Sequence, residues 1–274
     1  MLYNFIYWDI SPTIFELGTI PLRWYGLLFT TGIIISYWIV RQQFKRASLP
    51  DNSVETLTLY VLLGIILGMR LGHFLFYEPD ALWQRPHEVI LPFSFTPVFR
   101  FTGYQGLASH GGAIGIFLSL WLFHRKYPNI SIWFVLDQLA LVTPLAGAFI
   151  RLGNLFNSEM IGHPTTVPWA FVFAHVDLLP RHPAQLYESI SYLIIFLGLL
   201  IWKFRPGIRP PGMLFSLLLI FLFLARFIIE FFKINQVAFE NQLALNMGQL
   251  LSLPFIGLGI ILYFYCRRHP FTIS

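Results

Sequence analysis

Several arginines of this chain fall inside long apolar segments or at their edges, and these residues could do chemistry. They are Arg23, Arg70, Arg151 and Arg226. A charge at membrane depth is costly, so several charges that converge at one depth indicate a functional site. The planar guanidinium group binds a phosphate through two parallel hydrogen bonds. We interpret the set as an anion-binding site, and a phosphate at membrane depth indicates a phospholipid.

A structural explanation of the same charges stays open at this stage. Arg226 and Glu230 are four residues apart on one helix face and could simply pair. Arg23 and Arg181 could extend their charged ends to lipid headgroups. Few acids balance the arginines at that level, which favours the anion site for the set as a whole.

His110 is the candidate proton acceptor, in the sequence Ser109-His110-Gly111-Gly112. An unperturbed imidazole has a pKa of about 6.5 and can accept a proton near neutral pH. The glycines permit close backbone approach and leave room for a ligand. The alternative is a hydrogen-bonded core histidine. The 8 histidines are dispersed without a His-Glu-x-x-His motif, so we expect no metal site.

The segment 151–162 alternates polar and apolar residues directly after a long apolar run. Its polar side chains include Asn154, Asn157 and Glu159. This pattern is expected for a structured cap at a membrane interface. A tight turn explains the asparagines and glycines equally well, and composition alone favours the turn.

The elements that must position these residues are membrane helices. Of the 274 residues, 56% are hydrophobic and only 11% are charged, against roughly 25% charged in soluble domains. A spanning helix requires about 20 predominantly apolar residues and satisfies its own backbone hydrogen bonds. We therefore predict an all-α polytopic membrane protein, one domain over residues 1–274. Its seven expected helices are 24–40, 57–76, 107–123, 132–150, 186–202, 213–232 and 247–266.

The basic residues predict the orientation, because cytoplasmic loops retain excess Lys and Arg. The loops after the first, third and fifth helices, with the C-terminal tail, carry 10 of the 18 basic residues: Arg41, Lys45, Arg46, Arg125, Lys126, Lys203, Arg205, Arg209, Arg267 and Arg268. The N-terminus and the segment 151–185 are then outside the cytoplasm, and the C-terminus is inside. The polar residues at membrane depth fall in the outer half, except Asp137. The basic residues are scattered singly, so we expect no nucleic-acid partner.

The segment 151–162 and six further motifs in chain order resemble the prolipoprotein diacylglyceryl transferase family, and together they extend along almost the whole chain. The segment 151–162 is similar to the family signature, an Arg followed by Gly-Asn-Phe-x-Asn-Gly-Glu-x-x-Gly, and departs from it at Leu155, Phe156 and Ser158. A lysine, Lys233, stands where some relatives have an arginine. The other matching motifs are 24–26, 68–72, 109–112, 181–188, 225–232 and 247–249.

This resemblance implies a bacterial inner-membrane enzyme with seven helices, a small periplasmic head and no metal or cofactor. Its reaction would transfer the diacylglyceryl group of phosphatidylglycerol to the lipobox cysteine of a prolipoprotein, releasing glycerol 1-phosphate. The expected catalytic residues are His110, Tyr25, Arg151 and Arg226. The expected lipid-binding residues are Arg151, Arg226, Asn154, Glu159, Arg70 and Glu230, supported by Gly111, Gly112, Gly162 and Lys233.

Other function classes remain as alternatives. A lipid transporter or flippase would also place arginines at membrane depth, but transporters often contain repeats and bind near the midplane. This chain has no visible repeat. An intramembrane serine protease is suggested by adjacent Ser109 and His110. Adjacent helix positions point about 100° apart, which argues against that pair as a nucleophile and base.

Overall fold

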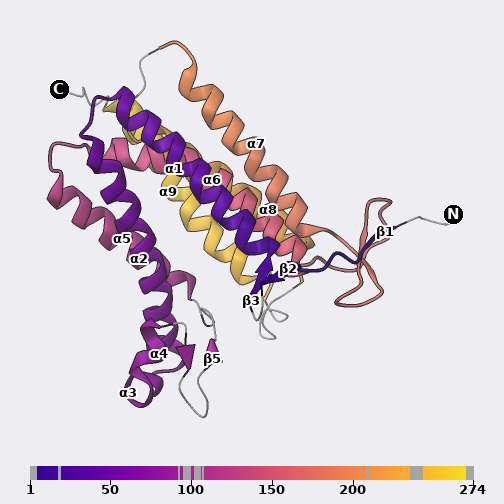
Figure 1. Ribbon diagram of the computed structural model, residues 1–274. Helices are drawn as coiled ribbons and strands as arrows, with labels where there is room; N and C mark the ends of the chain where they lie inside the picture. Colours follow the sequence, from indigo (N-terminus) through magenta and orange to yellow (C-terminus); the bar gives the residue numbers. More distant parts are fainter. Residues whose placement is uncertain are drawn as a thin grey trace. The chain divides into compact units, whose positions relative to one another are not determined.

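Long helices make up most of the chain (Figure 1). The computed structural model describes residues 5–17, 20–91, 93–94, 100–101, 106, 108–207, 210–234 and 243–269. Two residues used in the predictions lie outside this part of the chain. Leu107 is the first residue of the predicted third helix, and Arg209 is one of the 10 basic residues that predict the orientation. The long helices are α1 (Trp24–Arg46), α2 (Asp51–Tyr77), α5 (Ser109–Lys126), α6 (Ile132–Phe156), α7 (Ala184–Phe204), α8 (Met213–Ile229) and α9 (Met247–Arg268). The short ones are α3 (Ala81–Gln84), α4 (Pro86–Ile90) and the 3-10 helix η1 (Glu230–Phe232).

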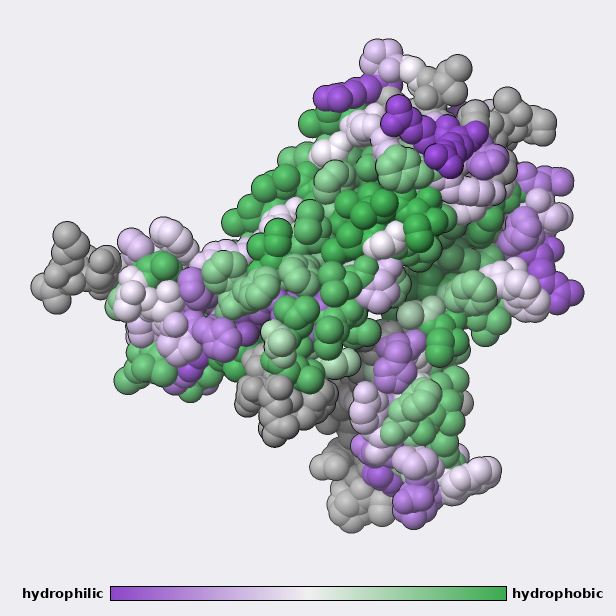
Figure 2. Space-filling view, turned by 180° about the vertical axis from the view of Figure 1, so that it is seen from behind, coloured by the Kyte–Doolittle hydropathy of each residue, from purple (hydrophilic) through white to green (hydrophobic). Residues whose placement is uncertain are grey.

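Each predicted apolar segment coincides with one long helix, and most helices extend a few residues further than predicted. Among the described residues, five helices are long and apolar enough to cross a membrane: Asp51–Tyr77, Ile132–Phe156, Ala184–Phe204, Met213–Phe232 and Met247–Arg268. Many large apolar side chains on the helices are exposed, such as Phe117 at 75% and Ile261 at 67%. Figure 2 shows how widely hydrophobic residues cover the surface. The chain is therefore a mostly helical, polytopic membrane protein.

Three small sheets were absent from the all-α prediction. β1 (Ile6–Trp8) pairs in parallel with β6 (Phe171–Phe173), which pairs antiparallel with β7 (Pro180–Arg181). β2 (Thr13–Leu17) and β3 (Ile20–Arg23) form a hairpin that leads into α1, and β4 (Phe93–Ser94) pairs with β5 (Arg100–Phe101). These strands have two to five residues, too few to give a visible alternation in the sequence.

The chain divides into two compact units, residues 1–40 with 133–274 and residues 41–132. Within the second unit, α2 and α5 pack through small residues. Gly64, Gly68 and Gly72 recur every fourth residue on α2, as do Gly111 and Gly115 on α5. A Cβ at Gly111 would lie 2.1 Å from the Gly68 carbonyl oxygen, and one at Gly115 would lie 1.9 Å from that of Gly64. Small residues at this spacing let two membrane helices approach closely.

Helix α6 is central to the first unit. Its residues Ala140 and Leu141 form a buried cluster with Leu199 of α7 and with Leu214 and Leu218 of α8. In the same helix, the buried Asp137 accepts hydrogen bonds from the backbone N–H groups of Gly212 (2.8 Å) and Phe215 (2.9 Å). The carboxylate thus satisfies free N–H groups at the start of α8. These contacts explain Asp137, the one polar residue at membrane depth that was predicted to lie on the cytoplasmic side.

Candidate functional site

The C-terminal end of α6 begins a chain of polar contacts. Arg151 donates from Nη1 to Asn154 Oδ1 at 3.2 Å, and Asn154 donates from Nδ2 to Glu159 Oε2 at 3.1 Å. Asn157 donates to the other Glu159 oxygen at 3.2 Å. Gln185 of α7 donates to the Glu159 backbone carbonyl. The predicted tight turn is present, and it also brings these polar side chains together.

This turn reverses the chain through left-handed backbone conformations. Ser158 has φ 55° and Met160 has φ 57°, values that bulky L-residues rarely adopt. The Glu159 backbone N–H returns to the Asn154 carbonyl at 2.9 Å. The strained residues on either side of Glu159 therefore direct its carboxylate back toward α6.

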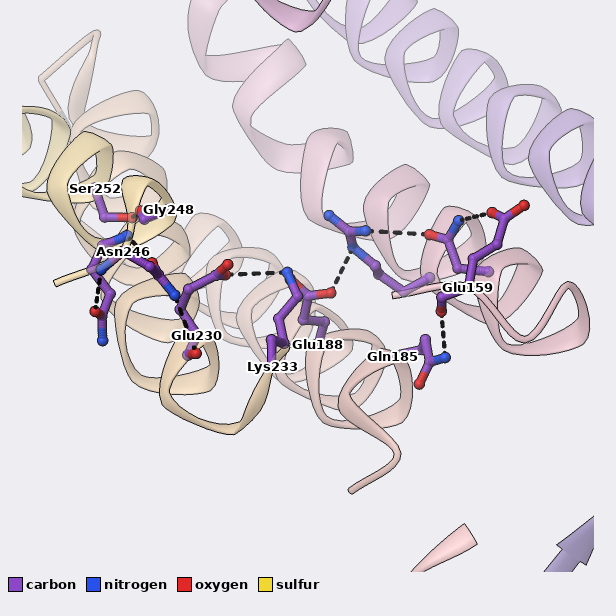
Figure 3. A network of polar contacts seen from close by, with 11 residues as sticks. Glu159, Gln185, Glu188, Glu230, Lys233, Asn246, Gly248 and Ser252 are labelled. Atoms are coloured by element: carbon purple, nitrogen blue, oxygen red, sulfur yellow. Dashed lines mark hydrogen bonds and ion pairs between the residues drawn. The ribbon is translucent and has the colours of Figure 1, made fainter. Parts of the chain in front are cut away.

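A second chain of contacts connects Arg151 to the residues that follow α8, and Figure 3 shows its labelled members Glu188, Lys233 and Glu230. Arg151 Nε lies 2.9 Å from Glu188 Oε2, and Glu188 Oε1 lies 3.5 Å from Lys233 Nζ. Lys233 Nζ also lies 3.1 Å from Glu230 Oε2. Glu188 is fully buried and Lys233 is 3% exposed. Buried charges are tolerated when they are paired in this way. The chain links α6, α7 and η1.

Lys233 thus has a different environment from a lipid-facing arginine. Its buried ammonium contacts two carboxylates, which suits the compact charge of a lysine. Next to it, Asn246 begins α9 with a capping box in which its side chain accepts from the Gln249 backbone N–H at 2.9 Å. Asn246 also donates to the Glu230 carbonyl at 3.5 Å. The start of α9 is therefore tied to the same polar group.

Arg226 lies near this chain without belonging to it. The charges of Arg151, Arg226 and Glu188 all act on the hydroxyl of Tyr192, a buried residue of α7. The suggested pair between Arg226 and Glu230 is not formed, because the Glu230 carboxylate contacts Lys233 instead. Within the part of the chain that the structure describes, the half-buried Arg226 side chain has no ion pair or hydrogen bond. Arg151 of α6 and Arg226 of α8 therefore both lie within electrostatic range of the same hydroxyl.

Tyr25, at the start of α1, joins the same region. It lies within electrostatic range of Glu159 and Arg151, and its ring packs against the backbone of Gly153. The ring also stacks on Phe29 at a centroid distance of 6.4 Å. Tyr25 was an expected catalytic residue, whereas Gly153, which sets the position of its ring, was not among the expected residues.

Gly162 holds the end of the 151–162 segment against the residues that follow α8. It forms a bridge with Lys233 and donates from its backbone N–H to the His182 carbonyl at 3.0 Å. A Cβ at Gly162 would lie 2.6 Å from the carbonyl oxygens of both His182 and Phe232. Only glycine fits here without movement of the backbone.

Two further polar groups lie in the segment between α6 and α7. Trp169 donates to the Tyr187 hydroxyl at 2.8 Å, and that hydroxyl lies 3.0 Å from His182 Nδ1. Burial lowers the pKa of His182, and nearby His163 lowers it further. Arg181 is buried and pairs with Asp177, lowering the pKa of that carboxyl group. The suggestion that Arg181 extends to lipid headgroups is therefore wrong.

The remaining expected site residues belong to the unit 41–132. His110 is exposed and lies edge-on to Phe76, with ring centroids 4.8 Å apart. Gly111 packs against Gly68 of α2, and a Cβ at Gly112 would lie 2.7 Å from Met69 Cγ. The space that we attributed to a ligand at these glycines is filled by α2.

Arg70 is buried inside the same unit. Its Nε donates to the Val89 carbonyl at 3.3 Å and its Nη2 donates to the Glu88 carbonyl. Its guanidinium also lies 4.8 Å from the centre of the Phe74 ring. Arg70 therefore ties α2 to α4 through free carbonyls at the end of the short helix.

Glu188, Gln185 and Tyr192 were not among the expected site residues. Gln185 and Glu188 are three residues apart on α7 and are both fully buried. The signal for Glu188 was available, because an acid at membrane depth already indicates function. Its partners could not be identified, since the contacts connect residues 45 and 37 positions apart in the chain.

Known proteins resemble this chain over nearly its whole length. The family model described as prolipoprotein diacylglyceryl transferase matches residues 12–265. A phosphatidylglycerol–prolipoprotein diacylglyceryl transferase of Bacteroides fragilis is 47% identical over 267 residues, covering 96% of each chain. Proteins of the same name from Chloroherpeton thalassium and Tolumonas auensis are 43% and 40% identical, covering 95% and 94% of this chain and 94% and 96% of their own. The chain belongs to the prolipoprotein diacylglyceryl transferase family.

Proposed function

We propose that this protein transfers the diacylglyceryl group of phosphatidylglycerol to the lipobox cysteine of prolipoproteins, the first step of lipoprotein maturation. The relatives named above carry this activity in their names. The observation that carries the proposal is that the charges of Arg151 and Arg226, on two different helices, both act on the Tyr192 hydroxyl. Two guanidinium groups at one position suit a phosphodiester, which accepts charge-assisted hydrogen bonds from both.

In this proposal Arg151 and Arg226 bind the lipid phosphate. They also stabilise the charge that develops on the phosphate as the leaving group departs. Asn154 and Glu159 hold Arg151 from one side. Glu230 acts on the site indirectly, through its ion pair with Lys233. Gly162 supports the turn that carries Glu159. For Arg70 the contacts with Glu88 and Val89 favour an indirect role, in which it keeps α2 and α4 together.

The transfer requires a thiolate, because the thiol itself is a poor nucleophile. The sulfur attacks the diacylglycerol carbon that bears the phosphate. The carbon–sulfur bond forms, the carbon–oxygen bond breaks with its electron pair on oxygen, and glycerol 1-phosphate leaves. The thiol proton passes to a base, for which the exposed His110 imidazole is the first candidate. Tyr25, or the phosphate itself, is the second. Gly111 and Gly112 support His110 by fixing α5 against α2.

We also propose that all seven long helices span the bacterial inner membrane as one domain over residues 1–274. This adds α1 and α5 to the five apolar helices above. Basic residues end α1, α5 and α9, which supports a periplasmic N-terminus and a cytoplasmic C-terminus. Residues 151–185 then form the small periplasmic head, built on β6 and β7. A single cysteine at the exposed Leu178, in a Cys266→Ser background, should react with an impermeant maleimide in intact spheroplasts.

Substitution of the two arginines tests the site. Purified protein in detergent is incubated with phosphatidylglycerol and a lipobox peptide, and the modified peptide is quantified. Removal of one charge-stabilising donor typically costs about 100- to 1,000-fold in kcat. We expect losses of this size for Arg151→Ala and Arg226→Ala, and near-normal transfer for the control Arg125→Ala. Near-normal transfer by Arg151→Ala would contradict the proposed binding mode.

A further inference from the structure

Glu188 is a buried acid with a specific arrangement of partners. Its side chain is fully buried, and its two oxygens face different cations. Oε2 lies 2.9 Å from Arg151 Nε, whereas Oε1 lies 3.5 Å from Lys233 Nζ. A buried carboxylate would be strongly destabilising without such partners. Charge balance alone, however, would not require a carboxylate at this particular nitrogen of Arg151.

The contacts of Arg151 fix the orientation of its guanidinium group. The planar group has five N–H donors on three nitrogens. Glu188 lies against Nε, and Asn154 accepts from Nη1. Neither contact uses Nη2. Two anchors on different nitrogens hold the plane in one orientation, and the side chain remains 18% exposed. The Tyr192 hydroxyl is a further hydrogen-bond partner of Arg151. The terminal nitrogens are thereby directed away from Glu188, and the N–H groups that these contacts leave free can face an anion.

Lys233 keeps Glu188 from cancelling the charge of Arg151. The lysine lies between Glu188 and Glu230 and shares the negative charge of both carboxylates. Gly162 pairs with the Lys233 backbone, and the capping residue Asn246 holds the Glu230 backbone. The Glu188 carboxylate is therefore itself held by the buried Lys233 and its partner Glu230 (Figure 3). Gly162 and Asn246 fix the backbone of that pair from two further segments.

We infer that Glu188 is a positioning residue for the transfer reaction, whose carboxylate orients Arg151 so that the terminal guanidinium nitrogens face the lipid phosphate. This inference rests on the proposed function of Arg151. It assigns Glu188 a role in the rate of transfer, since interactions with the departing phosphate must be aligned before the reaction begins. Glu188 contacts neither substrate in this scheme and acts only through Arg151.

The test compares Glu188→Gln and Glu188→Asp with the wild-type protein. After Glu188→Gln, Lys233 keeps Glu230 and Arg151 keeps Asn154 as partners, which favours a folded variant. A small misplacement of a catalytic group can cost about 100-fold in rate. We expect kcat of Glu188→Gln to fall about 10- to 100-fold, with KM for phosphatidylglycerol changing much less. Glu188→Asp should recover part of kcat, because it restores the charge.

Asp137→Asn is the matched control, because it neutralises another buried acid of the same unit that holds backbone rather than Arg151. It should lower the melting temperature while leaving kcat per folded molecule near the wild-type value. If Glu188→Gln does not fold, Glu188→Asp carries the test, with kcat expected to fall while the melting temperature changes little.

A double-mutant cycle separates positioning from a merely structural role. Arg151→Lys keeps the charge but removes the nitrogen that Glu188 contacts. The effects of substituting residues that act through one another are not additive. In the Arg151→Lys background, Glu188→Gln should therefore lower kcat little further, as measured over long incubations. A full additional loss there would overturn the inference, as would a folded Glu188→Gln variant with wild-type kcat. If wild-type protein forms no product at all, the proposed function fails instead.

Discussion

The ring of Tyr25 packs directly on the backbone of Gly153, two residues after Arg151. A Cβ on Gly153 would lie 2.7 Å from Tyr25 Cδ2 and 3.2 Å from Tyr25 Cα. No larger residue fits unless α1 or the Tyr25 ring moves. The glycine therefore determines how close the tyrosine hydroxyl comes to the charges of Arg151 and Glu159.

Gly153→Ala should impair both stability and transfer. Overpacking of this kind costs about 1–3 kcal/mol, and displacement of Tyr25 should reduce the transfer rate in the folded fraction. Thermal unfolding and the peptide assay measure the two effects. Gly198→Ala in α7 is the matched control, because its Cβ would meet no atom of a neighbouring element within 4 Å in the described part of the chain. Equal behaviour of the two variants would contradict the importance of this contact.

Ser158→Gly should stabilise the protein. Ser158 adopts φ 55°, which glycine reaches without steric cost. Its buried hydroxyl has no hydrogen-bond partner among the described residues, so the substitution loses no hydrogen bond there. We expect a gain of up to about 1 kcal/mol, typical of relieving one left-handed non-glycine residue. The measurement is the melting temperature in detergent, and a lower value than the wild type would show that the turn is not strained.

Gly111→Ala should separate α2 from α5. The added Cβ would lie 2.1 Å from the Gly68 carbonyl oxygen, and backbone cannot yield as a flexible side chain can. The expected cost is about 1–3 kcal/mol or more, measured by thermal unfolding. Gly257→Ala in α9 should be neutral, because among the described residues no atom of a neighbouring element lies within 4 Å of the added Cβ. A Gly111→Ala variant as stable as Gly257→Ala would mean that these helices do not pack as described.

Acidification should weaken the contacts around His182. The Tyr187 hydroxyl accepts from Trp169 and lies 3.0 Å from His182 Nδ1, to which it can donate its own proton when the imidazole is neutral. Burial lowers the pKa of His182 in the folded state. Below the usual histidine pKa of about 6.5, the His182 imidazole therefore binds a proton more readily in the unfolded chain than in the folded protein. The free energy of unfolding falls as the pH falls through that range.

Unfolding measured at several pH values from neutral downward checks this dependence. His182→Gln should flatten it, whereas His163→Gln should leave most of it in place, because burial is the larger cause of the His182 shift. An unchanged pH profile in His182→Gln would assign the effect to other groups.

The sequence predicted the helices well because membrane helices require long apolar runs that composition alone reveals. The predicted segment 132–150 became α6, extended to Phe156. The pairing of β1 with β6 was not predictable, since it joins Ile6 to Phe171 through very short strands. In the sequence, Ser158 stood out only as a departure from the family signature. Its left-handed backbone conformation could not be predicted from that departure.

Within the site, the chemical type of each residue was predictable but its partner was not. Arg151, Asn154 and Glu159 lie close together in sequence, and the structure brings them into contact. A pair between Arg226 and Glu230 was the structural alternative that helical spacing suggested. The chain leaves the α-helix at Glu230, where η1 begins, so Glu230 meets Lys233 instead. Tertiary contacts of this kind leave no periodic signal in the sequence.

Mass spectrometry of a lipobox peptide incubated with the purified protein and phosphatidylglycerol tests the central claim most directly. The account predicts a diacylglyceryl mass increase on the peptide cysteine, with glycerol 1-phosphate released in equal amount. Both products should disappear when Arg151→Ala replaces the wild-type protein. An unmodified peptide under several lipid conditions, especially with movement of lipid between leaflets and no covalent product, would contradict it.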